Sequence, residues 1–269
     1  DRSLKPYDTH YIPVGKEGAP TLEAIESHIH PTTKVLALSA VNSETGVKLD
    51  LERVAALAEA RGLIFIVDGV ALLGKESFSI PPGVSTMAFS AHKLGGPKGV
   101  GFCYVSDFAP PPYPTVVGGG QELDRRAGTE NLIGIAGMAA AMRRLSTQQP
   151  TFTEHMGELK ATFERVLLAH FGPNISINGE GGRVCNTTNL RFHGTDAETL
   201  LIQLDMNGVM ASHGSACSAG ALEPSRVLQA MGYTKQEAKQ SIRFSFSPNN
   251  TLSEIEEAIA LIKRLKVGQ

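Results

Sequence analysis

Short apolar segments alternate with segments of helical spacing through the first half of the chain. Strand-like runs occupy residues 34–41, 63–69, 86–91 and 99–106. Helical spacing marks residues 21–29 and 49–62, where Asp50 can cap the second helix and Gly62 can end it. Because nearly continuous apolar strands are typical of sheets buried on both sides, the pattern predicts an α/β fold: a parallel or mixed sheet with helices on both faces.

The pattern changes near residue 150. A Pro/Gly-rich loop at 108–121 precedes two helical stretches, at 131–146 and 152–171. Further strands are predicted at 175–179, 187–194, 209–214 and 241–247, and further helices at 196–206, 223–231 and 252–266. We therefore predict a large domain over residues 1–149 and a smaller α+β domain over residues 150–269.

Composition narrows the class of protein. Of 269 residues, 42% are hydrophobic and 19% charged, and the net charge of −2 argues against nucleic acid as the main partner. No apolar run approaches the roughly 18–20 residues that span a bilayer, so we expect no membrane partner. The three cysteines lack metal-ligand spacing and suit a reducing compartment, so we predict a cytoplasmic protein without a metal site.

The segment "AFSAHKLGGPKGVGF" (88–102) places Lys93 at the end of a predicted strand. Ligands collect at the carboxyl ends of strands in open α/β sheets. Ser90, His92 and the amides of the glycine-rich turn could hold an anion such as phosphate. The alternative is that Lys93 is a solvated loop lysine.

Asp68 and Arg243 are charged residues in otherwise apolar strands. Asp68 either caps the turn that follows its strand or meets a cation. A carboxylate that holds a pyridine nitrogen, with a lysine that forms a Schiff base, is typical of pyridoxal phosphate (PLP) enzymes. Arg243 either forms a structural salt bridge or binds a substrate carboxylate through its planar fork.

Two of the cysteines invite different interpretations. Cys217 lies in "ASHGSACSAGALEP", a run of small residues that could deliver a thiol to a site. Cys103 lies within the apolar run "VGFCYV", and we expect it to pack in the core.

Four segments, in this order, carry a family resemblance: "SAHKLGGPKGVG", "GGGQELDRRAGTEN", "GSACSAGALEPSRVL" and "SIRFSFS". Together they resemble the group I (NifS/IscS-type) cysteine desulfurases, which are PLP enzymes of the class V aminotransferase-like group. The resemblance implies the fold type I architecture, a large domain with a mixed, mostly parallel sheet and a smaller C-terminal α+β domain. It extends over the whole chain.

The resemblance also implies how PLP is held. Lys93 matches the Schiff-base lysine, and Asp68 matches the carboxylate that pairs with the pyridine nitrogen. Ser90 and His92 match phosphate ligands. Thr129 matches a phosphate ligand donated across the interface of a homodimer.

The implied reaction removes sulfur from L-cysteine and leaves L-alanine. Asn42 and Arg243 match residues that hold the substrate carboxylate, and Cys217 matches the nucleophile that takes up sulfur as a persulfide. A sulfur-acceptor protein, a scaffold or a sulfur carrier, is the implied partner, for supply to iron–sulfur clusters or to tRNA thiolation.

The sequence departs from the family pattern in two ways, and these leave other functions open. Ala71 stands where the family usually has a glutamine that bonds the cofactor's ring oxygen, and family members carry roughly a hundred or more residues ahead of this chain's first residue. If nothing supplies that part, we expect the sheet to expose apolar surface. The alternatives are a selenocysteine lyase, or a non-catalytic fragment that cannot hold PLP.

Overall fold

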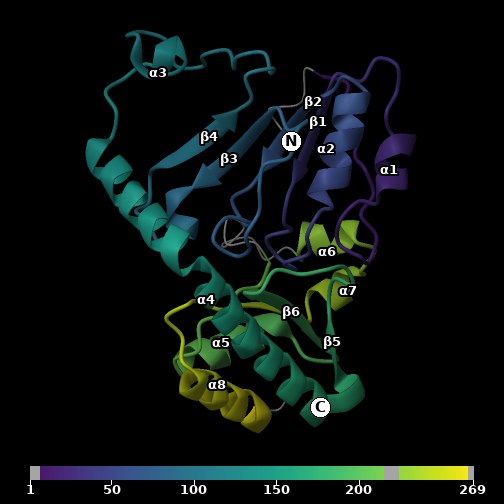
Figure 1. Ribbon diagram of the computed structural model, residues 1–269. Coiled ribbons are helices and arrows are strands. Elements are labelled where there is room, and N and C mark those ends of the chain that lie inside the picture. The colour runs from purple at the N-terminus through teal and green to yellow at the C-terminus, as the bar shows by residue number, and fades with distance from the viewer. Residues whose placement is uncertain (1–6, 215–223, 266–269) are drawn as a thin grey trace. The chain divides into compact units, whose positions relative to one another are not determined.

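The computed structural model describes residues 7–214 and 224–265 of the chain (Figure 1). Its contacts define two compact units. The central unit comprises residues 33–40 and 50–150, and the terminal unit comprises residues 1–32, 41–49 and 151–269. The division into domains at residues 149 and 150 stays a prediction; the contacts also divide the chain after Pro150, but they group residues 1–32 and 41–49 with the later segment.

A four-stranded mixed sheet forms the centre of the central unit (Figure 1). Its strands are β1 (Val35–Ser39), β2 (Ile64–Asp68), β3 (Thr86–Ser90) and β4 (Gly101–Val105), in that order. The first three strands are parallel and β4 is antiparallel to β3, so the prediction of a mixed sheet is confirmed.

Helix α2 (Leu51–Ala60) begins and ends where the sequence predicted. The Asp50 carboxylate accepts a hydrogen bond from the Arg53 N–H at 3.2 Å, which satisfies one of the free donors of the first turn. Gly62 has a φ of 62°, the left-handed conformation that terminates helices. The unit also contains the short turns η1 (Ala91–Lys93) and α3 (Gln121–Asp124).

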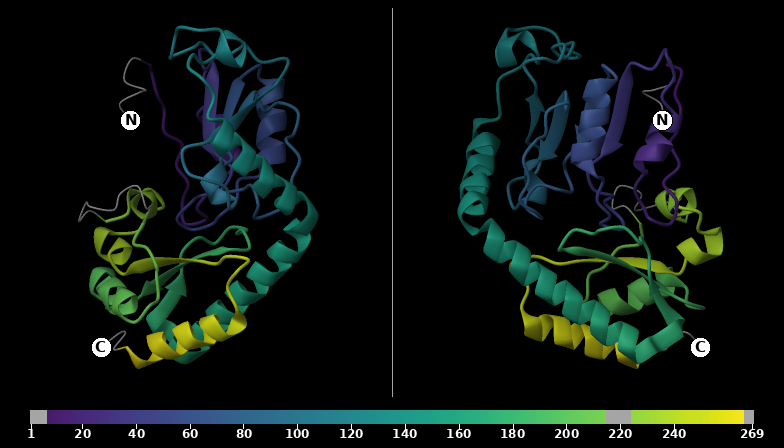
Figure 2. Two further views of the ribbon diagram at one scale, coloured as in Figure 1. Left: turned by 90° about the vertical axis from the view of Figure 1, so that its left-hand side faces the viewer. Right: turned by 45° about the vertical axis from the view of Figure 1, so that its right-hand side comes forward.

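Within the described part of the chain, only one face of this sheet is buried, and α2 lies on one side of it (Figure 2). Leu36, Phe65, Val67 and Met87 point into the buried face. On the opposite face Val35 is 48% exposed and Ile66 is 42% exposed, with Asp68, Ala88 and Cys103 also exposed. The prediction of helices on both faces is therefore wrong within the described residues, because no described segment buries this second face.

Helix α4 (Leu132–Phe171) is continuous where two helices were predicted. Pro150 lies inside it, although a proline cannot donate a backbone hydrogen bond and disfavours a helix interior. Buried side chains anchor the helix on both sides of Pro150, with Leu145 before it and Met156 and Phe163 after it. This packing outweighs the local cost of the proline, because tertiary contacts supply most helical stability in proteins.

The terminal unit contains a three-stranded antiparallel sheet in the order β5-β6-β7 (Figure 1). Its strands are β5 (Ile175–Ile177), β6 (Thr187–Phe192) and β7 (Ser241–Ser245). Its helices are α1 (Leu22–Ser27), α5 (Ala197–Met206), α6 (Arg226–Ala230), α7 (Lys235–Ala238) and α8 (Leu252–Arg264), with the turn η2 (Gly172–Asn174). The core combines Phe163 of α4, Phe192 and Phe244 of the sheet, Leu204 of α5 and Ile262 of α8.

The strand predicted at 209–214 forms only an isolated bridge. Ser212 exchanges two backbone hydrogen bonds with Arg243, at 3.1 and 2.8 Å. The chain leaves the ladder at Gly214, whose φ of 74° is incompatible with a strand.

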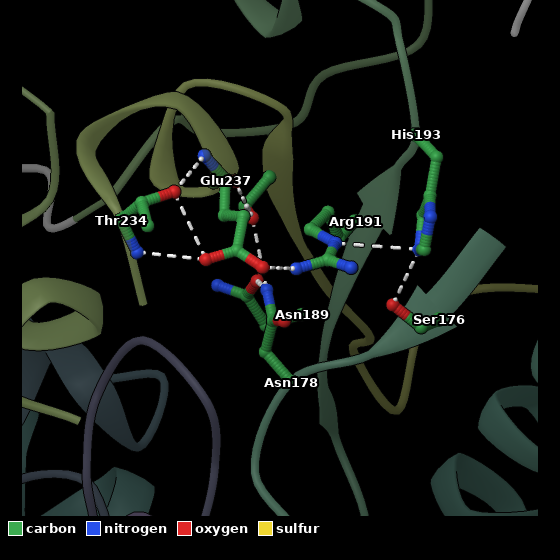
Figure 3. Close-up of polar contacts among 8 residues, drawn as sticks. Ser176, Asn178, Asn189, Arg191, His193, Thr234 and Glu237 are labelled. Atoms are coloured by element: carbon green, nitrogen blue, oxygen red, sulfur yellow. Dashed lines mark hydrogen bonds and ion pairs between the residues drawn. The ribbon is translucent and has the colours of Figure 1, made fainter. Parts of the chain in front are cut away.

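A polar network joins the terminal sheet to α7 (Figure 3). Thr234 and Glu237 form a capping box at the start of α7, and Glu237 also pairs with Arg191 of β6. Arg191 Nε donates to His193 Nε2 at 3.3 Å, and His193 Nε2 lies 2.9 Å from the Ser176 hydroxyl. The network links β5, β6 and α7 through side chains as well as through the ladder.

No helix among the described residues has the length and apolar character needed to cross a membrane.

Candidate functional site

Lys93 lies in the turn η1, directly after strand β3. Ala91, at the start of this turn, is fully buried, and its carbonyl accepts hydrogen bonds from the N–H groups of Leu94 and Gly96 at 3.1 and 2.9 Å. These bonds reverse the chain and leave the Lys93 side chain exposed. The lysine therefore stands at the carboxyl end of a strand, in the position that the sequence predicted.

Ser90 and His92 meet beside this turn. The Ser90 hydroxyl lies 2.8 Å from His92 Nδ1. Both residues line a cavity of about 420 Å³, together with Lys98, Gly99, Val100 and Gly101. A hydroxyl, an imidazole and an ammonium group can each donate a hydrogen bond to a phosphate oxygen. Lys98 was not among the predicted site residues, and its place in the glycine-rich turn "GGPKG" was the signal that could have indicated it.

Gly101 brings β4 close to the end of β3. A Cβ atom at this position would lie 2.3 Å from the carbonyl oxygen of Phe89, a distance that no side chain can occupy. The glycine thus allows β4 to pair with Ser90 and to form one wall of the cavity.

Asp68 ends β2 on the same sheet face as Ser90. In the register Asp68 lies opposite Ala88, and Ser90 is two residues further along β3. Standard sheet dimensions separate Asp68 and Ser90 by about 5 Å across the strands and about 7 Å along them. Asp68 also accepts a hydrogen bond from the Val70 N–H at 2.9 Å, so the predicted alternative of a turn cap is realised. Its carboxylate is exposed and can bind a further donor.

Within the described residues, neither Thr129 nor Cys103 lies with the residues around the cavity. Thr129 is exposed before α4 and does not line the cavity. Cys103 is exposed, which contradicts the expectation of a core position, because it points to the open face of the sheet opposite Ala88. Cys217 lies outside the described residues.

Arg243 and Asn42 meet at one turn of the terminal unit. Arg243 Nη1 donates to the carbonyl oxygen of Ser43 at 2.9 Å. Its Nε is buried and has no hydrogen-bond partner within the described residues. Burial lowers the pKa of the Arg243 guanidinium, and the nearby charge of Glu44 partly offsets this effect. An unsatisfied charged donor of this kind can bind a carboxylate.

The Asn42 side chain shapes the turn that receives Arg243. Its Oδ1 accepts from the N–H groups of Glu44 and Thr45 at 2.9 and 3.2 Å. Sequence reasoning missed Glu44, which is 3% exposed and accepts a hydrogen bond from the Ser225 hydroxyl. The sequence alone does not reveal that Glu44 is buried, because its hydrogen-bond partner Ser225 is distant in the chain.

Comparison with known proteins adds three findings. The family model described as "Aminotransferase class-V" matches residues 3–258. A cysteine desulfurase from Klebsiella pneumoniae is 37% identical over 261 residues, and the cysteine desulfurase IscS from Clostridium botulinum (strain Hall) is 32% identical over 259 residues. These alignments cover 95% of this chain in both cases, but the chain spans only 64% and 65% of the two relatives.

Solved structures show the same likeness. A NifS-like protein superposes with a TM-score of 0.86 at 30% identity, covering 97% of this chain and 68% of the other. A NifS-like protein from Rickettsia africae gives 0.83 at 28% identity, covering 97% and 71%. SspA, solved in complex with cysteine, gives 0.74 at 25% identity, covering 93% and 70%.

Proposed function

The chain belongs to the class V aminotransferase family, and on this premise we propose that it carries the catalytic residues of a PLP-dependent cysteine desulfurase. The observation that carries the proposal is the exposed Lys93 in the turn η1, which follows directly on Ser90, a residue that lines a cavity together with His92. The fold would be of type I, with the mixed sheet in its large domain and a smaller C-terminal α+β domain. The predicted cytoplasmic location is retained as part of the proposal.

The donors present fit PLP. A cavity of about 420 Å³ with a hydroxyl, an imidazole and an ammonium group can admit a phosphate, and Asp68 stands on the same face for the ring nitrogen. Lys93 would bind the cofactor covalently, and Thr129 would come from a second copy in a homodimer. Ala71 is half-buried and its methyl group cannot donate to the ring oxygen, so that contact would be lost. When bound, PLP supplies an aldehyde and a ring that withdraws electrons from the substrate's Cα.

Each side chain then has a chemical task. Asp68 keeps a proton on the ring nitrogen, because a carboxylate favours the cationic form of its partner. Ser90 and His92 orient the phosphate. The Lys93 amine moves the proton at the Cα atom of the substrate cysteine. Arg243 binds the substrate carboxylate, supported by the turn that Asn42 shapes.

The sulfur transfer is assigned to Cys217, which lies outside the described residues. Its thiolate forms a bond to the substrate sulfur as the substrate's carbon–sulfur bond breaks, and the carbon takes a proton. In net terms, L-cysteine and the enzyme thiol give L-alanine and an enzyme persulfide, with no external oxidant. An acceptor protein would then take the sulfur atom.

The test is turnover of L-cysteine by protein loaded with PLP. We expect alanine and, with a thiol reductant, an equal amount of sulfide, both lost in Cys217→Ser. PLP-loaded protein that forms no alanine would contradict the proposal. Turnover of selenocysteine alone, retained in Cys217→Ser, would indicate a selenocysteine lyase instead, because a selenol is the more acidic leaving group.

A further inference from the structure

One loop, residues 69–76, connects the two most important predicted cofactor ligands. It begins directly after Asp68, whose carboxylate accepts the Val70 N–H. It ends near Lys75, whose ammonium group donates to the carbonyl oxygen of Lys93 at 3.2 Å. The loop therefore starts at the end of β2, and through the Lys75 side chain it contacts the turn η1 after β3.

The loop is held in place along its length. The N–H of Leu72 donates to Gly69 O at 3.0 Å, and the N–H of Lys75 donates to Leu72 O at 3.0 Å. Gly74 adopts a φ of 81° beside the buried Leu145 of α4. The Gln149 side chain of α4 donates to the carbonyl of Glu76. Lys75 thus extends from an anchored backbone.

The Lys93 carbonyl that Lys75 contacts has no hydrogen-bond partner within η1 itself. Lys93 is the last residue of this turn, and terminal carbonyls have no partner within their own helical turn. A lysine side chain can bond such carbonyls, and its positive charge is favourable at that end of a helical turn. The contact fixes the backbone from which the Lys93 side chain departs.

We propose that Lys75 is a positioning residue for Lys93: it braces the turn η1 so that the Lys93 amine faces the Ser90–His92 cavity when PLP binds. The inference rests on the proposed function, because it assigns Lys93 a covalent bond to PLP. It adds a residue that does not touch the cofactor and acts through the backbone of another. Misplacement of a reacting group by about 1 Å can slow a reaction on the order of a hundredfold, so such a brace has a chemical consequence.

The experiment compares three variants with the wild-type protein. Lys75→Met keeps the apolar stem and removes the donor, Lys75→Arg restores a cationic donor, and Lys34→Met removes an exposed lysine elsewhere in the same unit. PLP affinity is measured by equilibrium dialysis. The rate of covalent attachment is measured by quenching with borohydride and quantifying the labelled Lys93 peptide.

We expect Lys75→Met to weaken PLP binding about 3- to 10-fold and to slow labelling by at least as much, given the modest strength of exposed charged contacts. Lys75→Arg should return both values to within about twofold of the wild type, and Lys34→Met should leave them unchanged. Wild-type values in Lys75→Met would overturn the proposal. Equal losses in Lys75→Met and Lys75→Arg would also overturn it, because they would indicate a merely structural role.

A measurement without PLP separates this inference from the proposed function. Amide hydrogen exchange of residues 91–96 should be faster in Lys75→Met than in the wild type and should be restored in Lys75→Arg. If the wild-type protein binds no PLP while this difference persists, the proposed function fails and the brace stands. If exchange is the same in both proteins, the brace is absent.

Discussion

At the scale of single residues, the predicted ligands also shape their own backbone. Asp68 caps the turn that follows β2, and Asn42 organises the turn that receives Arg243. The structural and functional alternatives considered for Asp68 are therefore compatible. These hydrogen bonds fix the conformation of each side chain in the unliganded protein. Less conformational entropy is then lost when a ligand binds.

Arg243 offers the sharpest test at this scale. We expect Arg243→Lys to raise the KM for L-cysteine about 10- to 100-fold with a smaller change in kcat, because a lysine cannot reproduce a planar two-point contact. Steady-state kinetics measure both constants. Arg191→Lys, on the neighbouring strand and paired with Glu237, is the matched control and should leave KM unchanged. A KM within twofold of the wild type would show that Arg243 does not bind the substrate.

At the scale of elements, β2 shows how an apolar run can mislead. The run "LIFIVD" predicted burial on both faces, but of its side chains only Leu63, Phe65 and Val67 are buried within the described residues. The pattern cannot reveal an open face, because apolar side chains on it look like core residues.

Two substitutions on β2 should therefore differ in cost. Val67→Ala should lower the free energy of unfolding by about 2 kcal/mol, since Val67 is 1% exposed and a cavity would remain. Ile66→Ala removes more atoms but should cost less than about 1 kcal/mol, because Ile66 already faces solvent. Urea denaturation measures both values. The reverse order would contradict the described register.

The ion pair between Glu164 of α4 and Arg183, in the segment before β6, predicts a pH dependence. Burial raises the pKa of Glu164, but hydrogen bonds from Arg183 and Thr188 outweigh it and hold that pKa below its usual value. Arg183 contacts both carboxylate oxygens, and the two side chains are only 15% and 12% exposed. A lowered pKa stabilises the fold above the unfolded value of about 4.3, and this contribution is lost as the pH falls through the folded pKa.

We expect Glu164→Gln to lower the free energy of unfolding by about 1–3 kcal/mol at pH 7 and to reduce the loss of stability between pH 5 and 3. Unfolding by urea across this pH range measures the effect. Glu198, exposed in the first turn of α5, provides the matched control as Glu198→Gln. Parallel pH profiles for the wild type and Glu164→Gln would contradict the assignment.

At the scale of the whole molecule, local signals predicted most elements, and tertiary partners decided the exceptions. The cap at Asp50 and the stop at Gly62 were correct because both act within one turn. Two helices were predicted at 131–146 and 152–171, yet packing on both sides of Pro150 carries the single helix α4 through this segment. Cys103 was misplaced because its exposure depends on which sheet face is covered.

The candidate site divides in the same way. Lys93, Asp68, Ser90 and His92 could be found from motifs because each lies at or just after the end of a strand. Glu44 and Lys75 could not, because their roles depend on contacts with residues distant in the chain.

The central claim is that Lys93 bonds covalently to PLP, and peptide mass analysis tests it most directly. The protein is incubated with PLP, reduced with borohydride, digested and compared with Lys93→Ala treated identically. We predict that the reduced cofactor is found on the peptide containing Lys93 and is lost in the variant. A label on Lys75 or Lys98 instead, or no label on any lysine while PLP remains bound, would contradict the account.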